Sequence, residues 1–329
     1  AGRYNVSGQQ NINIGYKAGF SDSSAGTSYD YNIAIGREAG TKLENDKIIC
    51  IGYRAGMVST TGTDNIFMGS NAGVANVGGA KNIYIGADSA KVAVSADQNV
   101  VIGHNSGSGL TGNDNILLGF KAGEDITGGA NNVVIGSNAM STSTGGASSC
   151  IVIGANAGLV NQSDDNMFIG KDAGYSNTTG TENIFIGSEA GYRHVIDDNN
   201  IFIGDRAGYG YVIFDYNYTK AQPYYGEDNI CIGKSSGESL TTGFANIFIG
   251  SESGKLATEA NQNICIGRQV GQNLSSGIFN VLIGPGCGVK NSTGQENVMI
   301  GADAAKENTT GIFNIYMGHA AGGQHSIDD

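Results

Sequence analysis

A nine-residue phrase, Asn-Ile-x-Ile-Gly-x-x-Ala-Gly, recurs eighteen times in this chain, mostly at intervals of sixteen to eighteen residues. Self-similarity at so short a period is typical of a chain that stacks one small unit many times. The repeat therefore predicts a solenoid, which grows by adding coils and has no single globular core. The glycine of each Ile-Gly pair is position 0 of its coil, and these glycines are Gly15, Gly36, Gly52, Gly69, Gly86, Gly103, Gly119, Gly136, Gly154, Gly170, Gly187, Gly204, Gly233, Gly250, Gly267, Gly284, Gly301 and Gly318.

Three consecutive apolar residues precede position 0 in most coils. Position −1 is Ile in fifteen coils, position −3 is always Ile, Val or Met, and position −2 is mostly apolar as well. Such short, β-branched or aromatic runs predict a strand that is buried on both faces. A helix does not fit between glycines spaced this closely. We therefore expect an all-β fold, a parallel β-solenoid of about eighteen 17-residue coils.

The apolar surface of these strands exceeds what a single solenoid buries. Side chains alternate across a strand, so positions −3 and −1 point one way and position −2 points the other. We expect −3 and −1 to form the core or a subunit seam, which leaves −2 as an apolar stripe on the outside. Soluble monomers rarely expose a stripe of that size. The pattern predicts a homo-oligomer in which identical chains cover it.

Position −4 is Asn in sixteen coils and differs only at Ile48 and Cys150. Stacked in register, these residues form an amide ladder, a structural role that repetition favours over a catalytic one. Glycines at +4 and −7 indicate two corners in each coil. The asparagines that we assign to this structural ladder include Asn65, Asn82, Asn99, Asn115, Asn132, Asn166, Asn183 and Asn200.

Composition excludes several classes of function. The formal net charge of −12 and the absence of a basic stripe argue against nucleic-acid binding. No apolar run approaches the roughly 18 residues of a membrane span, so we expect no membrane insertion. The five cysteines occupy repeat slots without a CxxC spacing, which predicts small buried side chains. Acidic residues at −5 lack the spacing of calcium-binding rolls, and we expect no cofactor or metal.

The phrase resembles the N-S-V-A-I-G-x-x-A repeat in the heads of trimeric autotransporter adhesins. Residues 177–191, which read N-T-T-G-T-E-N-I-F-I-G-S-E-A-G, look more like repeats of phage tail fibres. The resemblance covers about residues 8–322 and implies a left-handed β-roll, a homotrimer and a role in surface attachment. The longer period, and the lack of an anchor barrel, a coiled-coil stalk or a chaperone domain, depart from those families.

We assign residues 1–329 to one repeat domain, with an insertion at 209–228. No capping unit is visible to protect the strand edges at either end. The chain therefore looks like a fragment of a longer fibre, with flanking fibre domains or partner chains.

The insertion is the largest break in the period. Insertions in repeat proteins project as loops, often on a binding face, and tyrosines suit sugar and protein surfaces. Packing of the loop over the apolar stripe or over a subunit seam is the alternative. The candidate binding residues are Tyr209, Tyr211, Tyr216, Tyr218, Tyr224 and Tyr225.

Asn-x-Ser/Thr triplets place Asn161, Asn177, Asn291 and Asn308 at one slot, +7. They are either glycosylation acceptors or ordinary turn residues.

These observations predict a non-catalytic structural rod and attachment module of a trimeric fibre. A phage or virus tail fibre, exposed on the virion or otherwise extracellular, fits best, with a cell-surface glycan or protein as receptor. The alternative is the head of a bacterial trimeric adhesin or an extracellular filament subunit. A glycan-cleaving tailspike would need a local acid pair, for which only Asp215 and Glu227 qualify.

Overall fold

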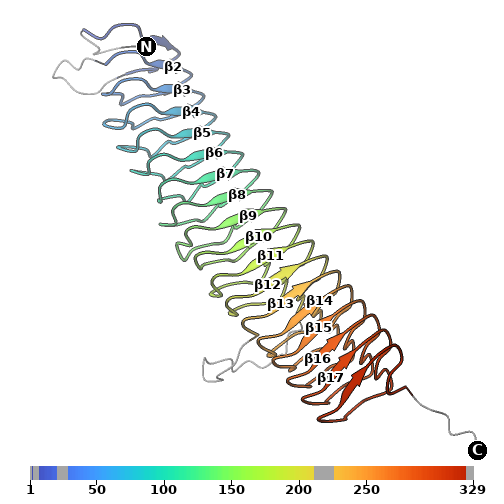
Figure 1. Cartoon of the computed structure of the whole chain (residues 1–329). Coiled ribbons are helices and arrows are strands. Elements are labelled where there is room, and N and C mark those ends of the chain that lie inside the picture. The colour runs from blue at the N-terminus through green and yellow to red at the C-terminus, as the bar shows by residue number, and fades with distance from the viewer. Residues whose placement is uncertain (1, 3–6, 21–28, 211–225, 324–329) are drawn as a thin grey trace, which may run out of the picture. The chain divides into compact units, whose positions relative to one another are not determined.

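The computed structural model describes residues 2, 7–20, 29–210 and 226–323. These residues form eighteen three-residue strands joined by turns and bends, with no helix among them (Figure 1). Each strand occupies positions −3 to −1 of one coil. The predicted all-β, parallel β-solenoid with coils of about 17 residues is confirmed.

The chain divides into two compact units, Ala1–Asp164 and Asp165–Asp329. The first unit contains β1 (Ile12–Ile14), β2 (Ile33–Ile35), β3 (Ile49–Ile51), β4 (Ile66–Met68), β5 (Ile83–Ile85), β6 (Val100–Ile102), β7 (Ile116–Leu118), β8 (Val133–Ile135) and β9 (Ile151–Ile153). The second contains β10 (Met167–Ile169), β11 (Ile184–Ile186), β12 (Ile201–Ile203), β13 (Ile230–Ile232), β14 (Ile247–Ile249), β15 (Ile264–Ile266), β16 (Val281–Ile283), β17 (Val298–Ile300) and β18 (Ile315–Met317).

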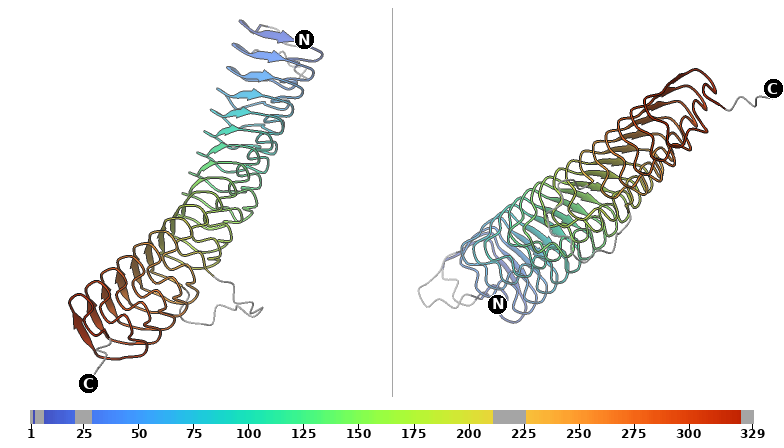
Figure 2. Two further views of the ribbon diagram at one scale, coloured as in Figure 1. Left: turned by 90° about the vertical axis from the view of Figure 1, so that its right-hand side faces the viewer. Right: turned by 90° about the horizontal axis from the view of Figure 1, so that it is seen from below.

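Within each unit, every strand pairs in parallel with the strand of the next coil. The register matches repeat slots, so that Phe168 lies opposite Phe185, and Phe185 opposite Phe202. The strands of a unit consequently follow one another along one side of its coils (Figure 2). Each slot of the phrase becomes a column of side chains that runs from coil to coil.

The burial pattern of the strands corrects one sequence prediction. Position −2 is the interior column: Phe67 and Phe168, for example, are fully buried. Positions −3 and −1 point outward, and in β7 the exposed fractions of Ile116 and Leu118 are 44% and 42%. The prediction that −2 forms the outer stripe is wrong, and the isoleucine-rich −3 and −1 columns form it. The reason is alternation: the buried asparagine at −4 lies two residues before −2, so both point inward.

Position 0 requires glycine because the backbones of successive coils approach closely there. Gly119 has a φ of 141°, a region that side chains rarely adopt. A Cβ atom on Gly119 would lie 2.6 Å from the carbonyl oxygen of Gly136 in the next coil. This contact explains why position 0 is invariant within the chain.

We expect Gly119→Ala to lower the free energy of unfolding by about 3 kcal/mol or more, because overpacking adds to the strained dihedral. Gly128→Ala is the matched control: its φ is 76°, and a Cβ atom added there would have no atom within 4 Å apart from those of Gly128 and its two chain neighbours. It should cost only about 1–2 kcal/mol. Chemical and thermal unfolding of both variants checks this, and equal losses would contradict the close-approach explanation.

Candidate functional site

The −4 asparagines form a buried hydrogen-bonded column, as predicted. In the first unit, the backbone N–H of Asn115 donates to Oδ1 of Asn99 at 2.9 Å, and its Nδ2 donates to the same oxygen at 3.1 Å. Nδ2 also donates to the carbonyl of Gly129 at 3.0 Å. Oδ1 of Asn115 accepts from the backbone N–H of Asn132 at 3.1 Å. Each amide therefore satisfies buried polar groups of the coils on both sides.

In the two coils without an asparagine at −4, the backbone N–H still donates to the asparagine of the preceding coil. The N–H groups of Ile48 and Cys150 still donate to Oδ1 of Asn32 and Asn132, at 2.7 and 2.9 Å. Neither side chain carries an amide to extend the ladder to the following coil. All eight asparagines assigned to the ladder from the sequence are buried. The amide groups of this column link successive coils by hydrogen bonds, and its structural role stays a prediction.

We expect Asn115→Asp to destabilise the chain by about 3–5 kcal/mol at neutral pH, because a buried carboxylate would then face carbonyl oxygens without a cation. Burial raises the pKa of such a carboxyl group, so lowering the pH should restore part of the lost stability. Asn131→Asp in the following coil is the control, since Asn131 is exposed. Unfolding midpoints at two pH values check the prediction, and a loss that does not depend on pH would contradict it.

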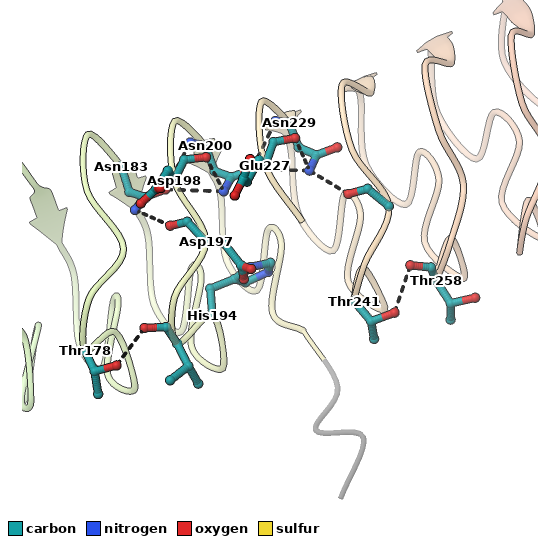
Figure 3. A network of polar contacts seen from close by, with 12 residues as sticks. Thr178, Asn183, His194, Asp197, Asp198, Asn200, Glu227, Asn229, Thr241 and Thr258 are labelled. Carbon is teal, nitrogen blue, oxygen red and sulfur yellow. Dashed lines mark hydrogen bonds and ion pairs between the residues drawn. The ribbon is translucent and has the colours of Figure 1, made fainter. Parts of the chain in front are cut away.

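A histidine and an aspartate form a buried pair in the second unit (Figure 3). His194 occupies slot +7, its exposed fraction is 2%, and its Nδ1 lies 2.6 Å from Oδ2 of Asp197. Asp197 stands at −7, where most coils have glycine. Its backbone carbonyl accepts from Nδ2 of Asn183 at 2.7 Å, which links the pair to the asparagine column.

The imidazole of His194 packs among apolar groups of the coil interior. Its ring centroid lies 4.8 Å from that of Phe202 and 6.2 Å from that of Phe185. Nε2 is buried and, among the residues that the structure describes, has no hydrogen-bond partner. Cβ atoms added to Gly210 and Gly226 would lie 3.5 and 3.6 Å from the ring. The histidine therefore lies against the two described ends of the insertion.

Other coils of this chain carry leucine and glycine at the two slots that His194 and Asp197 occupy. At slot +7, Leu110 and Leu240 occupy coils in which the following −7 residue is glycine. We expect His194→Leu alone to cost about 1–3 kcal/mol, because the carboxylate of Asp197 loses its partner in a buried site. The double variant His194→Leu with Asp197→Gly should be close to the parent chain in stability.

A double-mutant cycle based on unfolding free energies tests this coupling, and Asp197→Gly alone completes it. A coupling energy of about 1–3 kcal/mol is expected for groups in direct contact. Additive single effects would show that the two side chains do not stabilise one another.

Only one of the six tyrosines that we predicted as a binding site lies in the described part of the chain. Tyr209 is partly exposed and stacks on Tyr192 with ring centroids 5.2 Å apart. Tyr192 in turn stacks on Tyr175 at 4.9 Å. We did not predict this stack from the sequence, although the three tyrosines share slot +5 of successive coils. Outside the described residues lie Tyr211, Tyr216, Tyr218, Tyr224 and Tyr225.

Of the acid pair considered for glycan cleavage, only Glu227 lies among the described residues. Asp215 lies outside them. The backbone carbonyl of Glu227 accepts from Nδ2 of Asn229 at 3.1 Å and from the N–H of Ala245 at 3.0 Å. In the residues that can be placed, no group of three or more His, Cys, Asp or Glu side chains lies close enough to hold a metal ion.

The cysteines and three of the four asparagines of the +7 triplets are buried in the coils, whereas Asn308 is partly exposed. All five cysteines are buried and none is in a disulfide, and burial raises the pKa of Cys287 to about 11. Asn161, Asn177 and Asn291 are fully buried. A folded coil therefore does not present these three side chains for glycosylation, and Oδ1 of Asn291 instead accepts from the N–H of Gly294 at 2.9 Å, as a turn residue does.

The chain matches no protein-family model and no curated protein. Within the described residues, no helix has the length and apolar character needed to cross a membrane. The candidate site therefore rests on the geometry of this chain alone.

Proposed function

We propose that this chain is a non-catalytic structural rod and surface-attachment module of a homotrimeric fibre, of the kind found in phage or virus tail fibres. The proposal places it outside the cell, on a virion surface. The observation that supports it is the outward-facing double column of aliphatic side chains at −3 and −1. The repeat resemblance described above supports the choice of a trimer.

The aliphatic columns at −3 and −1 are exposed apolar surface of the kind that forms a protein–protein interface. Every described coil of both units contributes two such side chains, and several remain more than one third exposed, including Ile116 and Leu118 in the first unit and Ile266 in the second. Contiguous apolar surface of this extent marks an interaction site on a soluble protein. Burying it would contribute about 25 cal/mol for each Å² removed from water.

A second copy of the same chain is the partner that matches these columns best. The aliphatic pairs recur once per coil, at the spacing of parallel strands. Only a partner with the same rise per coil keeps its own side chains in step with them over many coils. Identical chains packed side by side meet that condition, and a closed ring of three leaves no aliphatic column exposed.

The head of a bacterial trimeric adhesin, or an extracellular filament subunit, is the alternative assignment. The same seam would serve in either case, and the resemblance of the repeat includes the adhesin heads. Tail genes or a membrane anchor encoded beside this gene would distinguish the two.

We expect the chain in solution to have three times the 33.8 kDa mass of one copy. The triple substitution Ile102→Lys, Leu118→Lys and Ile135→Lys, at three successive −1 positions, should convert the trimer to monomers at micromolar concentration. Each unpaired ammonium group buried in the seam costs several kcal/mol. Light scattering coupled to size-exclusion chromatography measures the mass.

The control places lysine at Val77, Val92 and Val94, which are exposed apolar residues outside the strands. This variant should keep the mass of the parent. A parent chain that is a stable monomer would refute the proposed trimer, and so would equal dissociation by the two triple variants.

A further inference from the structure

The column of stacked tyrosines at slot +5 of the second unit has no role in the proposed seam. Tyr175, Tyr192 and Tyr209 follow the corner that ends β10, β11 and β12, respectively. Their rings are nearly parallel, with interplanar angles of 17° and 4°. Because the rings cover one another's faces, the column presents ring edges and phenol groups to solvent, once per coil.

Two arginines lie at the Tyr209 end of this column. The guanidinium carbons of Arg206 and Arg193 lie 4.5 and 5.2 Å from the centroid of the Tyr209 ring. Arg206 is neutralised by acidic neighbours, because its Nη2 lies 2.9 Å from Glu238 and its Nε 3.6 Å from Glu189. Arg193 has no carboxylate within ion-pair distance among the described residues.

The other charges around the column are also paired. Asp172 lies 3.5 Å from the ammonium group of Lys171. The second oxygen of Glu238 lies 3.7 Å from the ammonium of Lys255. Arg193 is thus the one described cation of this cluster left for a ligand, in a chain whose net charge is −12. Its planar guanidinium group binds a carboxylate through two parallel hydrogen bonds.

The phenol of Tyr192 remains a hydrogen-bond donor at physiological pH. The pKa of Tyr192 is raised above its usual value, first by desolvation and then by the neighbouring tyrosines and the carboxylates of Asp172 and Glu189. A protonated phenol both donates and accepts, as sugar hydroxyls do.

We propose that Tyr175, Tyr192, Tyr209 and Arg193 bind an acidic polysaccharide strand along the tyrosine column. A sugar carboxylate pairs with the guanidinium of Arg193, and sugar hydroxyls exchange hydrogen bonds with the phenols. A polymer of repeating sugars fits a row of groups that repeats once per coil, whereas a peptide would present a different side chain at each step. The inference rests on the attachment role proposed above and names the ligand class for it.

The experiment uses the full chain and two probes with the same backbone, polygalacturonate and its methyl ester. Titration calorimetry should detect binding of the acidic polymer and much weaker binding of the ester. Arg193→Ala should weaken binding of polygalacturonate by about tenfold or more, since a charge-assisted bidentate contact is lost. Arg193→Lys should recover only part of it, and Tyr192→Phe, which keeps the stack but removes one hydroxyl, should weaken binding by a smaller factor.

Arg37→Ala is the matched control. Arg37 also lies beside tyrosine rings, 5.8 Å from that of Tyr16 and 6.0 Å from that of Tyr53, but it is paired with Glu38. Its removal subtracts the same charge from the chain and should leave binding unchanged.

Three results would overturn the inference: no binding of polygalacturonate to the parent chain, equal binding of the ester, or equal losses from Arg37→Ala and Arg193→Ala. The mass of every variant is measured in parallel. A trimer that does not bind the polymer refutes the ligand but leaves the rod intact. A monomer that binds it refutes the proposed trimer and retains the site.

Discussion

The buried amide at position −4 is the constraint on which the rest of each coil depends. Its side chain hydrogen-bonds with the preceding and the following coil, so it has to point into the solenoid. Alternation along an extended chain then directs −2 inward and −3 and −1 outward. One polar residue therefore decides which apolar column becomes core and which becomes surface. The aromatic side chains at −2 fill the interior, and the isoleucines are left on the outer face.

Close approach between coils is the second constraint, and it is met by backbone rather than by side chains. Glycines at position 0 allow carbonyl groups of the next coil to lie where a Cβ atom would otherwise be. Positions −5 and +2 also adopt positive φ, and there the chain uses many residues other than glycine, such as Asp114 and Lys121. Asp114 is exposed and Lys121 is partly exposed, so both positions leave room for a side chain. Positions −5 and +2 are therefore strict in backbone conformation but variable in side-chain chemistry, and the coils differ from one another there.

Those differences are what make parts of the second unit candidates for function. His194 with Asp197 replaces the leucine-and-glycine combination of other coils, and the tyrosine stack occupies a slot that elsewhere holds residues such as Lys255. The stack could have been predicted by comparing slot +5 across successive coils. The charge balance around it could not, because the partners of Arg206 come from slots +2 and +5 of neighbouring coils. Which arginine remains unpaired is a matter of rotamers and distances rather than of spacing.

The sequence by itself determined the solenoid, the position of every strand, the glycine corners and the asparagine column, because a period repeated eighteen times leaves few ways to satisfy the backbone. It did not determine which face of the strand is buried, since −1, −2 and −3 are all apolar and hydrophobicity alone cannot rank them. The tertiary structure decided that question through the inward amide at −4. It also decided the burial of Asn161, Asn177 and Asn291 and the pairing of His194 with Asp197, because both depend on side chains meeting within the closed coil.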